Sequence, residues 1–73
     1  MSRAAVIGEA VRTVGFGLAG AVVAAAETPE ETLAAWRALP ADVAVLVLTP
    51  RAAAWLGDAP AARPDVLVEV MPG

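Results

Sequence analysis

The residues that could do chemistry lie in two short stretches near the N-terminus. Residues 15–20 read Gly-Phe-Gly-Leu-Ala-Gly, which matches the G-x-G-x-x-G pattern of dinucleotide-binding turns. Glu9 follows an apolar run that ends at Gly8. A glycine-rich turn between a strand and a helix can hold a pyrophosphate at the helix N-terminus, whereas a carboxylate in that turn would repel it. The positions of these residues on strands and helices therefore decide between nucleotide binding and another role.

Other reactive groups are scarce. The chain contains no Cys, His, Tyr or Lys, so few side chains could act as a nucleophile or general base near neutral pH. Its net charge is −3, and its basic residues are scattered along the chain: Arg3, Arg12, Arg37, Arg51 and Arg63. Nucleic-acid binding requires a basic patch instead. We therefore expect a protein that is not an enzyme and has no catalytic residues, no bound cofactor or metal and no nucleic-acid partner.

Length and hydrophobic content suggest a small domain with a protein partner. The 73 residues are enough for one domain, which we assign to 1–73, and 59% of them are hydrophobic. A chain of this size buries only roughly 60% of the surface that its unfolded form exposes. We therefore expect it to bury apolar surface against another protein, and self-association is possible when it is isolated.

The uncharged run over residues 13–26 raises the question of a membrane or export segment. Its 14 residues fall short of the about 20 that a membrane-spanning helix needs. A cleaved export signal is an alternative, with Arg3 and Arg12 as its basic end. Glu9 in that basic end, and the lack of Cys to stabilise a secreted remainder, speak against export. We expect a cytoplasmic protein without direct membrane insertion.

Strand and helix patterns alternate along the chain. Apolar runs predict strands over 4–7, 21–26, 43–49 and 66–70, and helical patterns predict helices over 9–19, 29–39 and 50–56. Thr28-Pro29 and Thr49-Pro50 are typical of helix starts, and Glu31 is expected to complete a capping box with Thr28. Short crossovers through helices require parallel strands. The expected fold is α/β, a small Rossmann-like (doubly wound) domain with a four-stranded parallel sheet and about three helices.

These elements place the glycine pattern in the wrong position for a nucleotide. The first strand is expected to end at Ile7, and the turn after it is Gly8-Glu9. The pattern lies at the end of the following helix, where the dipole is unfavourable for phosphate. We favour an interpretation in which Gly15 and Gly17 allow close packing and Gly20 ends the helix. Nucleotide binding is retained only as an alternative.

The segment "AVIGEAVRTVGFGLAGA" resembles the opening of the F subunit of V-type/A-type ATPases. In that family a strand ends in Ile-Gly-Asp/Glu and the next helix closes in Gly-Phe-x-Leu-Ala-Gly. The matching residues are Ile7, Gly8, Glu9, Gly15, Phe16, Leu18, Ala19 and Gly20. The stretches "TPEETLAAWRAL", "VAVLVLTPRAAAWL" and "RPDVLVEVMPG" resemble the family's later elements. Position 17 is Gly where family members often have a longer side chain.

The resemblance implies a non-catalytic subunit in the central stalk of a proton- or sodium-translocating ATPase. Its partners would be other rotary ATPase subunits, chiefly the coiled-coil D subunit, at the cytoplasmic periphery of the membrane. The family's C-terminal tail and helix have no counterpart after Gly73. A receiver-like or other small protein-interaction domain is the alternative, although receiver chemistry needs Asp where this chain has Thr49.

Three residues are candidates for a partner interface: Glu9, Arg12 and Phe16. Glu9 and Arg12 are expected near the carboxyl edge of the sheet, where α/β domains place their sites. We favour a solvated helix start for this pair, with an interface as the alternative. Phe16 lies off the face formed by Val11, Val14 and Leu18, so it is either an exposed anchor or folds over the helix end. For Trp36 and Trp55 we favour core packing, since both lie at helical spacing with leucines.

Overall fold

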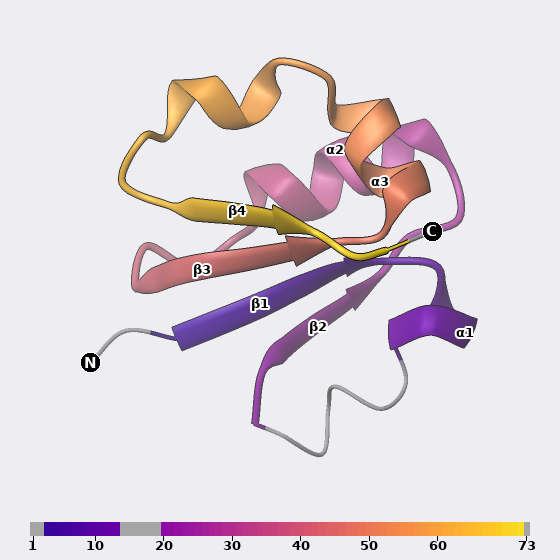
Figure 1. The fold of residues 1–73 in the computed structure, drawn as a ribbon, viewed down its shortest axis with the longest axis horizontal. Helices are drawn as coiled ribbons and strands as arrows, with labels where there is room; N and C mark the ends of the chain where they lie inside the picture. Colours follow the sequence, from indigo (N-terminus) through magenta and orange to yellow (C-terminus); the bar gives the residue numbers. More distant parts are fainter. Residues whose placement is uncertain (1–2, 14–19, 73) are drawn as a thin grey trace.

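The computed structural model describes residues 3–13 and 20–72, and it confirms the predicted α/β fold. Its elements in chain order are β1 (Arg3–Gly8), α1 (Ala10–Thr13), β2 (Val22–Ala25), α2 (Pro29–Arg37), β3 (Val43–Leu48), α3 (Pro50–Leu56), the 3₁₀-helix η2 (Ala59–Ala62) and β4 (Leu67–Val70). All strand pairs are parallel, and the strands lie in the order β2-β1-β3-β4 (Figure 1). β1 and β3 are therefore the central strands.

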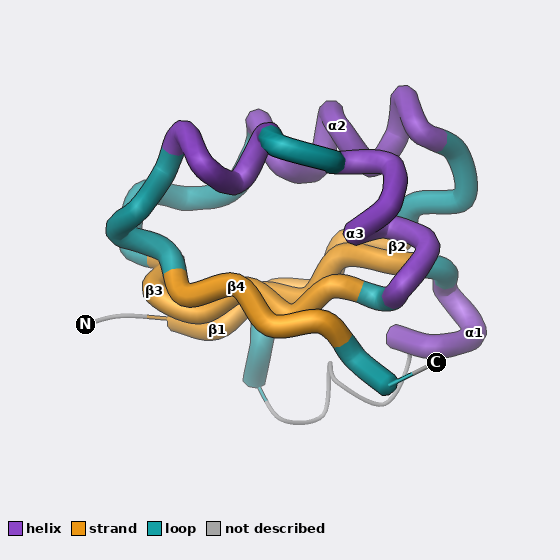
Figure 2. Tube along the Cα trace, turned by 45° about the horizontal axis from the view of Figure 1, so that its top comes forward, coloured by secondary structure: helices purple, strands orange, loops and turns teal. Residues whose placement is uncertain are grey.

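The helices divide between the two sides of the sheet. α2, α3 and η2 lie over one face, whereas α1 lies at the carboxyl edge away from them (Figure 2). The connection from β1 leads to one side of the sheet, to β2. The connection from β2 crosses back over β1 to β3, and the next continues outward to β4. This is the winding of a doubly wound sheet, and it places the start of each helix at the carboxyl edge.

The core forms where the central strands meet α2 and α3. Ile7 of β1 and Leu46 of β3 have no exposed surface, and Leu48 is 1% exposed. Their neighbours on the opposite sheet face are also apolar, and Val6 is 1% exposed. Parallel strands that are covered on both faces favour unbroken apolar runs of this kind.

The two tryptophans have different environments. Trp36 of α2 is 7% exposed and belongs to the core cluster, as predicted. Trp55 of α3 is only half-buried and lies outside that cluster, so the prediction of core packing was wrong for this residue. Helical spacing placed it near the core, but Ala52 and Leu56 occupy the inward face of this short helix.

Other differences from the predictions concern α1 and the last loop. Val11 is 85% exposed, so the expectation that it belongs to a packed apolar face was wrong; the buried residue of α1 is Thr13. Residues 58–65 were predicted as a loop and contain η2.

Gly20 and Gly57 have φ values of +81° and +54°. Glycine adopts such positive φ values more easily than any other residue, so it is favoured in both turns. The remaining residues of the predicted first helix, including Phe16, lie outside the described residues.

The second helix begins with the predicted cap. The Thr28 hydroxyl accepts a hydrogen bond from the Glu31 amide at 3.1 Å, and Pro29 occupies the first helical position. The Glu31 carboxylate accepts a hydrogen bond from the Glu27 amide at 2.8 Å. In a standard capping box the donor would be the amide of the N-cap residue, Thr28. The cap therefore fixes the connection between β2 and α2.

We expect Thr28→Ala to lower the free energy of unfolding by about 1 kcal/mol, because the substitution leaves the Glu31 amide without its side-chain acceptor. Thr28→Ser, which keeps the hydroxyl, is the matched control and should remain near the wild-type value. Urea unfolding followed by circular dichroism measures both. Equal stability of the alanine variant and the wild type would show that this cap contributes nothing.

Candidate functional site

The carboxyl edge between β1 and β3 is the switch point of the sheet. The chain leaves β1 toward β2 and leaves β3 toward β4, so the segments after these adjacent strands diverge. In open α/β sheets, ligands bind in the crevice that such a divergence creates. In this protein Gly8 and Glu9 reach that point from β1, and Thr49 reaches it from β3.

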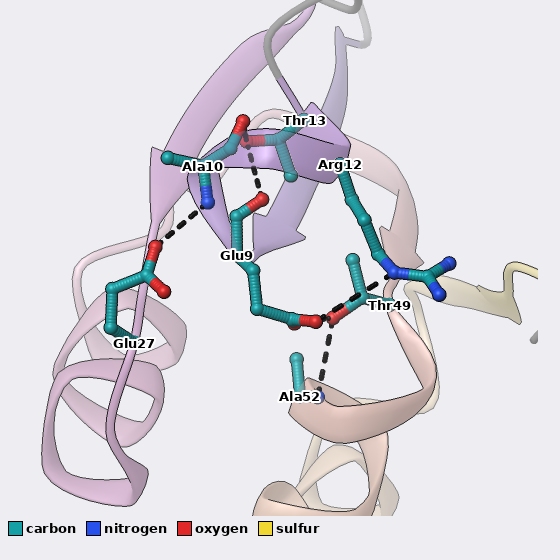
Figure 3. A network of polar contacts seen from close by, with 7 residues as sticks. All are labelled: Glu9, Ala10, Arg12, Thr13, Glu27, Thr49 and Ala52. Atoms are coloured by element: carbon teal, nitrogen blue, oxygen red, sulfur yellow. Dashed lines mark hydrogen bonds and ion pairs between the residues drawn. The ribbon is translucent and has the colours of Figure 1, made fainter.

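The side chain of Glu9 fills the switch point. The Thr49 hydroxyl donates a hydrogen bond to Glu9 Oε1, across 40 positions of sequence (Figure 3). Arg12 Nε lies 3.8 Å from Glu9 Oε2. The Glu9 side chain is only 12% exposed, so the favoured interpretation of a solvated helix start was wrong for this residue. Its carboxylate is bound within the protein and points across the site where a ligand phosphate would approach.

Thr49 has two roles at the same point. Its hydroxyl oxygen accepts a hydrogen bond from the Ala52 amide at 3.3 Å, which caps α3, while its proton is donated to Glu9. Its backbone amide donates to the Ile7 carbonyl at 3.2 Å, and the residue has no exposed surface. Thr49 thus connects β1, α3 and the Glu9 carboxylate through hydrogen bonds. Its hydroxyl group both donates and accepts a hydrogen bond within the protein.

Gly8 allows this close contact between the two strand ends. A Cβ atom at position 8 would lie 2.1 Å from Thr49 Cγ2 and 2.5 Å from Thr49 Oγ1. Real Cβ contacts are not this short, so a side chain at position 8 would displace Thr49. Gly8 therefore serves packing within the protein, and its open side is already taken by Thr49.

A second glutamate occupies the start of α1. Glu27 Oε2 accepts a hydrogen bond from the Ala10 amide at 2.8 Å (Figure 3). At the other end of α1, the Thr13 hydroxyl donates a hydrogen bond to the carbonyl oxygen of Glu9 at 3.2 Å. A helix start is a favourable position for an anion. Here the protein supplies that anion itself, and an incoming phosphate would face two carboxylates.

The predicted interface residues are brought together only in part. Glu9 and Arg12 lie in contact at the carboxyl edge, as expected, and Phe16 lies outside the described residues. Thr49 and Glu27 were not predicted as part of this cluster. Thr49 was identified as a helix cap, and only the pairing of β1 with β3 brings its hydroxyl to Glu9. Within residues 3–13 and 20–72, no cluster of acidic side chains has the arrangement of a metal site.

The surroundings of Glu9 keep its carboxyl group ionised. The Thr49 hydrogen bond lowers the pKa of Glu9 most, a backbone hydrogen bond at Glu9 adds to this effect, and partial burial opposes it. The charges of Arg51 and Arg12 lower the pKa further. Because the pKa in the folded state is below that in the unfolded chain, the stabilisation is complete above the ordinary glutamate value of about 4.3 and is lost as the pH falls through the folded pKa.

We therefore expect the free energy of unfolding to decrease as the pH is lowered below about 4.3, and Glu9→Gln to weaken this dependence. Asp42 is the control, since its pKa is also lowered, chiefly by a hydrogen bond from Arg3, but the pair is well exposed. Exposed ion pairs contribute little, so Asp42→Asn should change the pH dependence less. Urea midpoints measured between pH 3 and pH 7 test this, and an unchanged profile for Glu9→Gln would contradict it.

Comparisons of this chain with protein-family models, curated proteins and solved structures gave no match. Among the helices of the described residues, none has the length and apolar character required to cross a membrane. The function is therefore inferred from the geometry of the switch point and from the sequence resemblance.

Proposed function

We propose that this protein is a non-catalytic subunit of the central stalk of a V/A-type rotary ATPase, where it contributes to coupling ATP turnover to proton or sodium transport. The observation that carries the proposal is the closed switch point: Glu9 and Thr49 bond to each other over Gly8, where a nucleotide would otherwise bind. Gly8 and Glu9, which form this closure, are also two of the residues that carry the resemblance to the rotary ATPase family.

The same geometry argues against the two alternatives with chemistry. A dinucleotide or ATP phosphate at the end of β1 would meet the carboxylates of Glu9 and Glu27. A receiver domain needs a phosphate-accepting Asp after the third strand, and Thr49 at that position is fully buried with its hydroxyl engaged. We therefore favour a role in protein–protein contact, without bound cofactor.

Exposed apolar side chains support a partner-binding role. Four large ones are exposed among the described residues: Val11, Val23, Leu67 and Val70. Val11 lies in α1, directly after the carboxyl end of β1, and Val70 ends β4 at the same edge of the sheet. We propose that the central-stalk coiled-coil subunit is the chief partner, with the complex at the cytoplasmic periphery of the membrane.

The experiment that tests the proposal is complex formation in vitro. The full chain is mixed with the purified coiled-coil stalk subunit from the same organism and separated by size-exclusion chromatography. Co-elution in a defined complex is expected. Separate elution of two folded proteins would overturn the proposal, and phosphoryl labelling by a small phosphodonor would favour the receiver-like alternative.

A further inference from the structure

The sheet ends in two edge strands, β2 and β4 (Figure 1). Each pairs with one neighbour, so no other strand of the described residues binds the backbone N–H and C=O groups on its outer side. After β2, the Ala26 amide donates a hydrogen bond of 2.8 Å to the Gly8 carbonyl of β1. Because the backbone groups of successive residues point to opposite sides of a strand, those of Val23 and Ala25 point away from β1. These two residues form the open side of β2.

The two edge strands differ in their protection against pairing with another chain. β4 carries Glu69, and Pro64 and Pro72 flank it. Charged side chains and prolines are devices by which natural proteins prevent edge strands from pairing. The segment 20–26, which contains β2, has neither a charged residue nor a proline, and Val23 is 36% exposed. The open side of β2 is therefore the edge that favours the addition of a strand.

The charges around the two edges favour a second copy of this chain at β2. A two-fold axis perpendicular to the sheet sets β2 antiparallel to β2 of the second copy, with Val23 opposite its counterpart. The two copies of Glu27, which follows the uncharged run, then lie at opposite ends of the paired strands. The same pairing through β4 would set Glu69 opposite or diagonal to its counterpart, and like charges placed in this way are destabilising.

We propose that two copies of this chain pair through the open sides of β2, so that their two four-stranded sheets become one continuous sheet. In this dimer the backbone groups of Val23 and Ala25 bond to the second copy, and the Val23 side chain contacts its counterpart. The inference goes beyond the proposed function and concerns the chain by itself. Because β2 has only four residues, the contact is small, and we expect a weak dimer that forms at high protein concentration.

The test combines sedimentation equilibrium of the purified full chain over a range of concentrations with hydrogen exchange of single amides followed by NMR. We expect the mass to rise from one chain to two. The amides of Val23 and Ala25 should exchange at least about tenfold more slowly at the highest concentration than at the lowest. The amides of Val68 and Val70 are the internal control and should not change, because the Met71 amide donates to the Leu48 carbonyl and those two point away from β3.

Two variants change the open side of β2 in different ways. Val23→Lys sets two like charges opposite each other and should weaken the dimer by more than about tenfold. Ala25→Pro removes an amide that points away from β1, a position where an edge strand accepts proline, and should also weaken the dimer. Leu67→Lys is the matched control, because Leu67 is an exposed apolar residue of the other edge strand, and it should dimerise like the wild type.

Thermal unfolding verifies that each variant is folded, and either β2 variant is sufficient if the other fails to fold. A mass of one chain at every concentration would overturn the inference. So would slow exchange of the Val23 and Ala25 amides at the lowest concentration, which would show that the chain closes this edge itself. A dimer weakened by Leu67→Lys and not by a folded β2 variant would place the contact elsewhere. None of these outcomes bears on binding to the stalk subunit, so the proposed function is tested separately.

Discussion

Gly8→Ala is expected to lower the free energy of unfolding by about 3 kcal/mol, because the site has no room for a methyl group. The added Cβ would lie 2.1 Å from Thr49 Cγ2, 2.5 Å from Thr49 Oγ1 and 2.8 Å from Thr49 Cβ. Thr49 is fully buried and is fixed by bonds to β1 and α3, so it cannot move aside without breaking them. The melting temperature of so small a domain should fall by more than about 10 °C.

The control for this prediction is Gly57→Ala. Gly57 also has a special requirement, a φ of +54°, but a Cβ there would meet no atom within 4 Å. With φ +54° and ψ −122°, alanine at this position should cost about 1–3 kcal/mol from backbone strain alone. The double variant Gly8→Ala/Thr49→Ala removes the two closest atoms, so its loss of stability should be smaller than the sum of the single losses by about 1 kcal/mol or more. Additive losses would show that position 8 and Thr49 do not compete for the same space.

Thr49→Val is expected to lower the free energy of unfolding by about 2.5–4 kcal/mol. The substitution keeps the shape of the side chain but removes the hydroxyl that accepts from the Ala52 amide and donates to Glu9. Loss of a helix cap costs about 1 kcal/mol, and loss of a hydrogen bond to a charged group costs about 1.5–3 kcal/mol. Chemical unfolding at pH 7 measures the total.

The pH dependence distinguishes the two losses. Because the Thr49 hydrogen bond is the main cause of the lowered pKa of Glu9, Thr49→Val should also weaken the loss of stability at acid pH. Thr49→Ser keeps the hydroxyl and should retain most of the stability and the pH profile. A valine variant as stable as the serine variant would contradict the assigned hydrogen bonds.

Much of the fold was predictable because its signals are local. The unbroken apolar run "VAVLVL" indicated a central strand, and β3 covers it. Thr28-Pro29 and Thr49-Pro50 fixed the starts of α2 and α3, since the capping threonine and the proline act within a single turn. The ends of elements that have no such residue were predicted less well, and the four residues of η2 were missed altogether.

The site was predictable only in part, because its central contact is not local. Glu9 and Thr49 are 40 positions apart, and their hydrogen bond exists because β1 and β3 are neighbours with Ile7 opposite Leu48. The alternation of strands and helices predicted a parallel sheet but not that β1 and β3 would be adjacent. Gly8 was predicted as part of a turn, and nothing in the surrounding sequence indicated that Thr49 occupies the space beside its Cα atom.

The closed switch point distinguishes this protein from nucleotide-binding domains of the same fold. A doubly wound domain that binds nucleotides keeps this crevice open for phosphates. In this protein a buried threonine, an ionised glutamate and a glycine fill it, and the acidic Glu27 occupies the start of α1. This filled edge supports our proposal of a role in contact with another protein over the alternative of nucleotide binding.

A native pull-down of the tagged full chain from its own cells, with the bound proteins identified by mass spectrometry, tests the proposed place in the central stalk. Gly8→Ala, which should be poorly folded, is the matched negative bait. We predict that the wild-type bait recovers the central-stalk and catalytic subunits of a rotary ATPase and that the variant recovers far less. Recovery of none of these subunits by a folded wild-type bait would contradict the assignment to the central stalk.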